Sequence, residues 1–163
     1  MDLHPDSLVV STGRPHEPGD PLNTGIVPVT AYRTDESGNR YARFAVSPTV
    51  AAFEQVIGVL EGGRALAFSS GIAALAAVVD RLPVGSVVVV PDEGYSGTVL
   101  TFREHEALGR LVLRRVAPAD TDAVRAACVG ADLVWVETVS NPLMSIVDLP
   151  AVAAAAHEAG AVL

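Results

Sequence analysis

The chain has 163 residues, of which half are hydrophobic and 18% are charged, and its formal net charge at pH 7 is -8. This composition is typical of a globular domain with a sizeable core and excludes an intrinsically disordered chain. The negative charge would repel a polyanion, which argues against nucleic-acid binding.

Metal, disulfide and membrane roles also find no support in the composition. Cys128 is the only cysteine, so no internal disulfide can form. The four histidines lack the spacing of metal ligands, and no metal site is expected. Charged residues, Gly or Pro interrupt every apolar run well before the roughly 20 residues that a membrane span needs. We therefore expect a cytoplasmic protein without membrane contact.

The first part of the chain differs in character from the rest. Residues 1–46 are rich in Pro, Gly, Asp and Thr and have only short apolar runs, which predicts an extended arm. The pattern then becomes helical, with Ser47 as the N-cap, Pro48 as the first helical residue and a glycine pair, 62–63, at the end. We therefore expect a second region, residues 47–163, that carries the folded domain.

This second region alternates strand-like and helix-like segments. The expected strands are short apolar runs at residues 65–68, 87–90, 111–116 and 133–137. The expected helices lie at residues 72–82, 99–108, 120–128 and 149–159, with Asp120 or Thr121 and Asp148 as caps. Continuous apolar strands separated by helices predict a parallel sheet with helices on both faces, which places the fold in the α/β class.

The last three residues, 161–163, are an apolar run after Gly160, which is an expected helix end. They have the character of the start of another buried strand. We therefore expect the fold to continue beyond them, in a longer polypeptide or in a second one. We also expect that the chain does not fold alone, because one edge of its sheet is uncovered.

A turn of small residues, Ser69-Ser70-Gly71-Ile72, lies between an expected strand and an expected helix. Free amides at the start of that helix, and the positive end of its dipole, could bind a phosphate. Small residues in this position more often form a plain turn, so the segment alone does not identify a site. All eleven cationic residues are arginine, so the chain has no lysine.

Seven short segments, in chain order, match successive signatures of one protein family. They are Y-A-R at 41–43, S-P-T at 47–49, L-E-G-G at 60–63, S-S-G-I-A-A at 69–74, Y-S-G-T at 95–98, E-T-V-S-N-P at 137–142, and Asp148 followed by A-H at 156–157. Together they resemble the first part of the pyridoxal-phosphate (PLP) enzymes of the cystathionine γ-synthase/γ-lyase family. The resemblance implies a type I PLP-enzyme fold, like that of aspartate aminotransferase, with its N-terminal arm and the first part of its cofactor domain.

The resemblance also implies PLP as the cofactor and roles for individual residues. Tyr41 and Arg43 match the pair that contacts the cofactor phosphate of a neighbouring subunit, and a phenol and a guanidinium both suit a phosphate. By its residues alone this segment would be a solvated loop. Ser70, Gly71 and Ile72 match the main-chain phosphate cradle of the chain's own site.

Three further residues complete the implied site. Tyr95 matches the aromatic residue that stacks on the pyridine ring of the cofactor. Asn141 matches the residue that hydrogen-bonds the ring hydroxyl oxygen, and Glu137 is a carboxylate at the end of the preceding strand. The residues alone also allow plainer roles, namely a half-buried loop tyrosine, an Asn-Pro turn and a sheet-edge acceptor.

The chain departs from the family pattern in several places. The family's Schiff-base lysine, its pyridinium-binding aspartate and its substrate-binding arginine have no counterpart here, so the chain alone is expected to be inactive. Ser47 and Ile72 replace the usual Asn and Met, which are mild changes. Gly97 stands where methionine γ-lyases of the family carry a reactive cysteine, which argues against a dedicated methionine γ-lyase.

These observations leave three functional hypotheses. The favoured one is a part of a PLP-dependent lyase or transferase that eliminates or replaces a group on a sulfur-containing amino acid. A lysine-bearing second polypeptide would complete it, in a homo- or hetero-oligomer such as a dimer of dimers. The second is a non-catalytic binding or regulatory module derived from the same family. The third, an unrelated nucleotide-binding α/β domain, lacks a G-x-G-x-x-G turn and leaves the order of the motifs unexplained.

Overall fold

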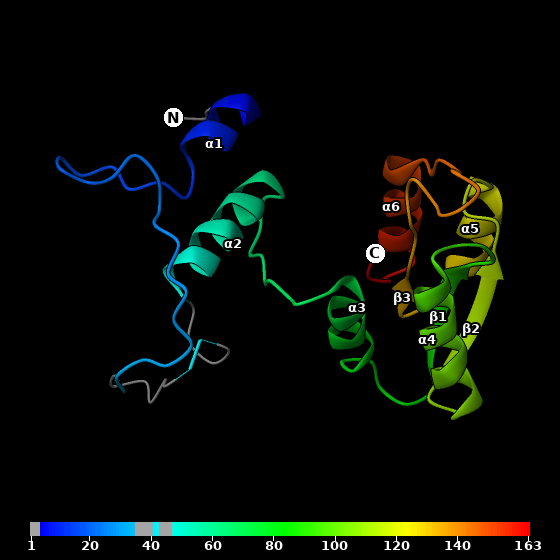
Figure 1. Cartoon of the computed structure of the whole chain (residues 1–163). Coiled ribbons are helices and arrows are strands. Elements are labelled where there is room, and N and C mark those ends of the chain that lie inside the picture. The colour runs from blue at the N-terminus through cyan, green and yellow to red at the C-terminus, as the bar shows by residue number, and fades with distance from the viewer. Residues whose placement is uncertain (1–3, 35–40, 43–46) are drawn as a thin grey trace. The chain divides into compact units, whose positions relative to one another are not determined.

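The structure is a computed structural model that describes residues 4–34, 41–42 and 47–163. The chain divides into two compact units, Met1–Phe68 and Ser69–Leu163, whose elements are labelled in Figure 1. The predicted boundary between an arm and a domain at residue 46 stays a prediction. Within the described residues, no helix combines the length and the apolar character needed to cross a lipid bilayer.

The first unit contains two helices, α1 (Pro5–Ser11) and α2 (Pro48–Leu60). The segment predicted as an extended arm contains the helix α1, where a proline begins the helix and the His4 side chain accepts a hydrogen bond from the Asp6 amide. The prediction for α2 is confirmed, because Ser47 caps it by accepting a hydrogen bond from the Val50 amide at 3.2 Å.

The segment after α2 corrects one prediction. Residues 65–68 are not a strand, and Leu66 and Phe68 are 66% and 46% exposed. A strand needs a neighbour with which its backbone can pair, and no strand of the described residues pairs with this segment. The apolar run at 65–68 is therefore a connection in this structure and not part of the core.

The second unit is built on a parallel sheet with the order β2-β1-β3. Its strands are β1 (Ser86–Pro91), β2 (Leu111–Val116) and β3 (Leu133–Val134). β3 is shorter than the predicted 133–137 strand. Val162 forms a parallel bridge with Leu133, so the chain does return to the sheet after Gly160, as the sequence pattern predicted.

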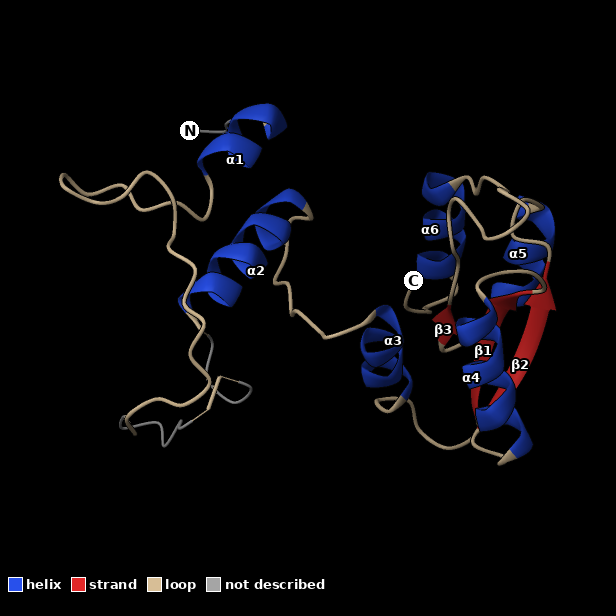
Figure 2. Cartoon of the chain, in the orientation of Figure 1, coloured by secondary structure: helices blue, strands red, loops and turns tan. Residues whose placement is uncertain are grey.

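Four helices cover the two faces of this sheet (Figure 2). They are α3 (Gly71–Val79), α4 (Ser96–Ala107), α5 (Thr121–Cys128) and α6 (Leu149–Glu158). Val88 and Val89 of β1 point to opposite faces, as successive strand residues do. Val88 packs with α3 and α4, and Val89 packs with α5 and α6. Because both faces of β1 are buried, its sequence is continuously apolar, and the predicted α/β class is confirmed.

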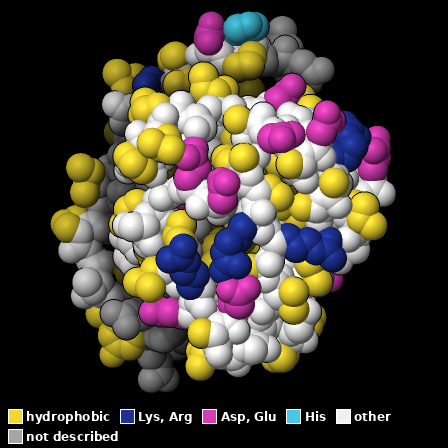
Figure 3. All heavy atoms as spheres, turned by 90° about the vertical axis from the view of Figure 1, so that its right-hand side faces the viewer, with side chains coloured by type: hydrophobic (Ala, Val, Ile, Leu, Met, Phe, Trp, Pro, Cys, Tyr) yellow, Lys and Arg dark blue, Asp and Glu magenta, His cyan; other side chains and the backbone are white. Residues whose placement is uncertain are grey.

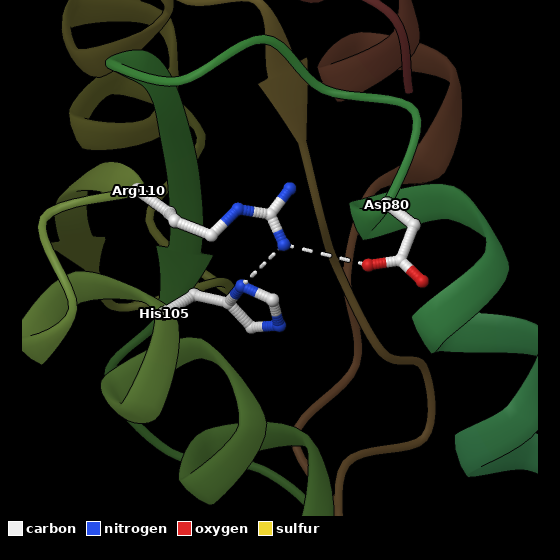
Figure 4. Close-up of polar contacts among 3 residues, drawn as sticks. All are labelled: Asp80, His105 and Arg110. Carbon is white, nitrogen blue, oxygen red and sulfur yellow. Dashed lines mark hydrogen bonds and ion pairs between the residues drawn. The ribbon is translucent and has the colours of Figure 1, made fainter.

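A polar cluster ties α3 to the C-terminal end of α4 (Figure 4). The Arg110 guanidinium lies 3.4 Å from a carboxylate oxygen of Asp80 and 3.2 Å from a ring nitrogen of His105. Asp80 follows α3, where a negative charge is disfavoured by the helix dipole, so the arginine offsets an unfavourable position.

The outer edge of β2 is protected by charge. Arg114 and Arg115 lie on this strand, and Figure 3 shows basic side chains beside acidic ones on this side of the molecule. Arg115 donates to Glu106, and this hydrogen bond lowers the pKa of the Glu106 carboxyl. Arg114 donates to the carbonyl of Ala127 at the end of α5. Charged side chains on an edge strand discourage pairing with a foreign strand.

Candidate functional site

A pocket of about 420 Å³ opens at the carboxyl ends of β1 and β3. Along the chain β1 is followed by β2 on one side, and then by β3 on the other side of β1, so the strand order reverses between β1 and β3. Ligands of open parallel sheets bind at such reversals. The volume lies in the usual range for small-molecule sites, roughly 300–1,000 Å³.

One wall of the pocket is the first turn of α3. Ser70 caps this helix, and its hydroxyl oxygen accepts a hydrogen bond from the Ala73 amide at 3.1 Å. Within the described residues, the amides of Gly71 and Ile72 have no acceptor. A Cβ atom on Gly71 would meet nothing within 4 Å, so the space before these amides is open. Two free amides at the positive end of a helix form a cradle for an anion.

The opposite wall is the first turn of α4, which carries Tyr95. Tyr95 is 49% exposed, and its ring packs over Gly97, because a Cβ on Gly97 would lie 2.6 Å from Cε1 of that ring. The same Cβ would lie 2.9 Å from Cδ1 of Ile72, so the ring and the α3 side chain come close above a glycine. The absence of a side chain at Gly97 is therefore what lets the ring lie here.

The inner part of the pocket comes from Leu75, Thr98 and Trp135. Trp135 packs against Phe102 with ring centroids 5.8 Å apart and an interplanar angle of 65°, an edge-to-face arrangement. The indole N–H of Trp135 is buried without an acceptor among the described residues. Glu137, which follows β3, lines the pocket and accepts a hydrogen bond from the Tyr95 amide at 2.9 Å.

Five of the eight residues predicted from the sequence line this one pocket. They are Ser70, Gly71, Ile72, Tyr95 and Glu137. The sequence reasoning missed Leu75, Thr98 and Trp135; the single tryptophan of the chain, two residues before Glu137, was the signal available.

The other three predicted residues lie elsewhere. Asn141 is exposed and is not part of the pocket lining, so its contact with a cofactor stays a prediction. Tyr41 is 54% exposed and forms an antiparallel bridge with Ala31 in the first unit. Arg43 lies outside the described residues.

The donor set fits a flat ligand that carries a phosphate. The α3 amides suit the anion, the Tyr95 ring and the Ile72 and Leu75 side chains suit an apolar ring, and no cationic side chain of the described residues lines the pocket. PLP has this combination of an aromatic ring and a phosphate. The fold and the site therefore define an α/β domain of the kind that holds a phosphorylated ring cofactor at the carboxyl edge of its sheet.

Comparison with known proteins identifies the family. The profile of the Cys/Met metabolism PLP-dependent enzymes matches residues 7–163, and the chain belongs to this family. A cystathionine gamma-synthase of Mycobacterium bovis is 43% identical over 119 residues, covering 71% of this chain. A cystathionine beta-lyase of Coxiella burnetii is 34% identical over 167 residues, covering 95% of this chain. The predicted family and its cofactor, PLP, are thus confirmed.

A solved structure shows the same fold. The crystal structure of a cystathionine gamma lyase from Micromonospora echinospora superposes with a TM-score of 0.82 at 29% identity over 99% of this chain. The predicted type I PLP-enzyme fold is thereby confirmed. The chain spans 30% and 42% of the length of the two relatives and 44% of the solved chain, so it corresponds to part of such an enzyme.

Proposed function

We propose that this chain is the cofactor-anchoring part of a PLP-dependent enzyme that breaks or exchanges a carbon–sulfur bond in a sulfur-containing amino acid. The observation that carries the proposal is a pocket that brings together the α3 amides, the Tyr95 ring and Glu137 at the reversal of the strand order. The named relatives, a cystathionine synthase and a cystathionine lyase, support sulfur amino acids such as cystathionine as the substrate class.

The residues of this chain would bind and orient the cofactor. The amides of Gly71 and Ile72 would donate to the phosphate, and the Ser70 hydroxyl, whose oxygen already accepts from the Ala73 amide, keeps its own proton free to donate as well. The Tyr95 ring would pack on the face of the pyridine ring and exclude water from it. PLP, when bound, supplies an electron sink for breaking bonds at the amino-acid carbons.

The chain does not supply the amine of this chemistry. It has no lysine, and an arginine cannot replace one because its guanidinium keeps its proton at every physiological pH. The proposal therefore requires a lysine from outside this sequence, either in a longer polypeptide or in a second polypeptide that completes the sheet next to Val162. The predicted role of Tyr41 and Arg43 at a neighbouring subunit's site, an oligomer, and a cytoplasmic location belong to the same proposal.

The test is to purify the native assembly and to measure its intact mass, its PLP content and its activity on cystathionine. Reduction with borohydride followed by peptide mass spectrometry then locates the lysine that carries PLP. We expect a PLP–lysine adduct on a segment absent from this sequence, and carbon–sulfur bond cleavage or exchange only when that segment is present. An assembly that contains this chain and turns over cystathionine without any lysine-bound PLP would contradict the proposal.

The absence of lysine also favours a second candidate, a non-catalytic module that binds full-length relatives. The same purification distinguishes the two. In the regulatory case the chain co-purifies with complete enzymes, and PLP content and activity depend on the partner but not on Tyr95. Replacing Tyr95 by Ala in this chain would then leave the activity of the assembly unchanged, whereas the cofactor-anchoring proposal expects a loss.

A further inference from the structure

Helix α4 lacks the local side-chain cap that α2, α3, α5 and α6 have. α2, α3, α5 and α6 each follow a Ser or Asp whose side chain accepts a hydrogen bond from an amide three residues later. α4 follows Tyr95, whose side chain makes no such bond. A tyrosine hydroxyl sits at the far end of the ring, too far from the backbone to cap its own helix. The turn that carries one wall of the pocket is therefore not fixed by its own residues.

Glu137, on another part of the chain, instead holds the backbone of Tyr95, the residue that precedes α4. Its Oε2 accepts a hydrogen bond from the Tyr95 amide at 2.9 Å. The same oxygen would lie 3.2 Å from a Cβ placed on Gly94, so the glycine allows the carboxylate to lie close against the backbone. A negative charge at this end of α4 also interacts favourably with the helix dipole.

The Tyr95 side chain has contacts of its own, with Gly97 and Ile72. Its ring packs over Gly97, and Ile72 of α3 approaches the same place. Glu137 therefore holds the backbone of Tyr95 while Gly97 and Ile72 define where the ring lies. Without the carboxylate, the 92–95 connection between β1 and α4 would have one contact fewer to define its path, and the ring would move with it.

We infer that Glu137 is a positioning residue, whose carboxylate fixes the Tyr95 backbone and thereby holds the Tyr95 ring as the wall on which an aromatic ligand packs. The sequence predicted Glu137 as a strand-end carboxylate of the cofactor site; in the structure it contacts the Tyr95 amide. The identity of the ligand as PLP rests on the proposed function, but the hydrogen bond and its effect on the ring do not.

Two substitutions separate positioning from direct charge contact. Glu137→Gln keeps an oxygen that can accept from the Tyr95 amide and removes the charge. Glu137→Ala removes the acceptor altogether. If the carboxylate acts through the Tyr95 amide, the Gln variant resembles the wild type and the Ala variant does not. If the charge itself bound the ligand, both variants would lose affinity equally.

The first measurement is hydrogen exchange on this chain within its purified native assembly, compared among the variants. The Tyr95 amide should exchange about tenfold faster or more in Glu137→Ala, because its acceptor is lost, and close to the wild-type rate in Glu137→Gln. The amides of β1 provide an internal reference for the fold, and they should stay unchanged. Glu106→Ala is the matched control, since it removes a carboxylate near the other end of α4.

The second measurement is PLP affinity by titration of the same variants. We expect weaker binding in Glu137→Ala, by about the two- to tenfold that an aromatic stacking contact contributes, and near wild-type binding in Glu137→Gln and Glu106→Ala. The inference is overturned if the Tyr95 amide exchanges at the same rate in all variants, or if its rate and those of β1 rise together in Glu137→Ala. Equal PLP affinity of wild type and Glu137→Ala would also overturn it.

A different result would contradict the proposed function without affecting the inference about Glu137. If the wild-type chain and its native assembly bind no PLP, the identity of the ligand is wrong. The exchange data alone then decide whether Glu137 positions Tyr95.

Discussion

A methyl group added at Gly97 tests the geometry of the pocket wall. In Gly97→Ala the new Cβ would lie 2.6 Å from Cε1 and 3.3 Å from Cδ1 of Tyr95, and 2.9 Å from Cδ1 of Ile72. Favourable carbon contacts begin near 3.5 Å, so the ring is roughly 1 Å too close and has to move. Because Tyr95 is 49% exposed, its ring can swing toward solvent, away from its place at the pocket.

The change should separate stability from ligand binding. Gly97 is the second residue of α4, where Ala is favoured over Gly by up to about 1 kcal/mol, and this gain opposes the cost of moving the ring. We expect the free energy of unfolding to change by less than about 1 kcal/mol. The loss of ring stacking should weaken PLP binding by about 0.5–1.5 kcal/mol, which is roughly two- to tenfold in Kd.

The assay is a PLP titration together with urea denaturation of the cofactor-free native assembly that contains wild type, Gly97→Ala or Gly63→Ala. Gly63 is the matched control because a Cβ there meets nothing within 4 Å and its backbone is not left-handed. Unchanged PLP affinity in Gly97→Ala would refute the placement of the Tyr95 ring against the cofactor. A large loss of stability without any effect specific to binding would refute the reasoning that the ring can move freely.

Three further predictions follow from the second unit. Gly71→Ala should leave the stability of the fold equal or higher, because its Cβ has open space at a helix start. It should weaken the binding of phosphate and of PLP by filling the cradle, and titration calorimetry with each ligand measures this loss. Phe102→Ala should cost about 3–5 kcal/mol in urea unfolding and change the emission of Trp135, its edge-to-face neighbour; an unchanged midpoint would contradict the core described above. Burial raises the pKa of the Cys128 thiol, so the folded state disfavours the thiolate; stability should fall as the pH rises above the ordinary thiol value of 9.0, and less so in Cys128→Ala.

Local signals in the sequence predicted the helices well. Ser47, Asp120 and Asp148 were expected as caps, and each one accepts a hydrogen bond from an amide three residues later. A cap is an interaction between near neighbours in the chain, so it can be predicted without knowledge of the rest of the fold. The predicted bounds of β2 at 111–116 were confirmed for a similar reason, since turn residues flank a short segment of strand-forming residues.

The errors arose where the local structure depends on contacts with distant parts of the chain. The run at 65–68 has the composition of a strand, but pairing depends on a neighbour that the described residues do not provide. The start of α4 was placed at Val99 and lies at Ser96, because no side-chain cap marks it and the Tyr95 amide just before the helix donates to Glu137 on a distant part of the chain.

In the candidate site, too, the sequence predicted which residues take part but not their contacts with distant residues. The order of the motifs indicated which residues belong to the site, and Ser70, Gly71, Ile72, Tyr95 and Glu137 do share one pocket. The sequence could not show that the Glu137 carboxylate accepts a hydrogen bond from the Tyr95 amide, since the pairing of β1 with β3 is what brings these residues together.

The most direct test of the central claim is an NMR titration with PLP of the native assembly, freed of its cofactor, in which this chain alone is isotope-labelled. If the pocket at the end of β1 and β3 holds the cofactor, the amide signals of Gly71, Ile72 and Tyr95 should shift most, and inorganic phosphate should move only the first two. If PLP shifts signals elsewhere and leaves these three amides unchanged, the pocket is not a cofactor site.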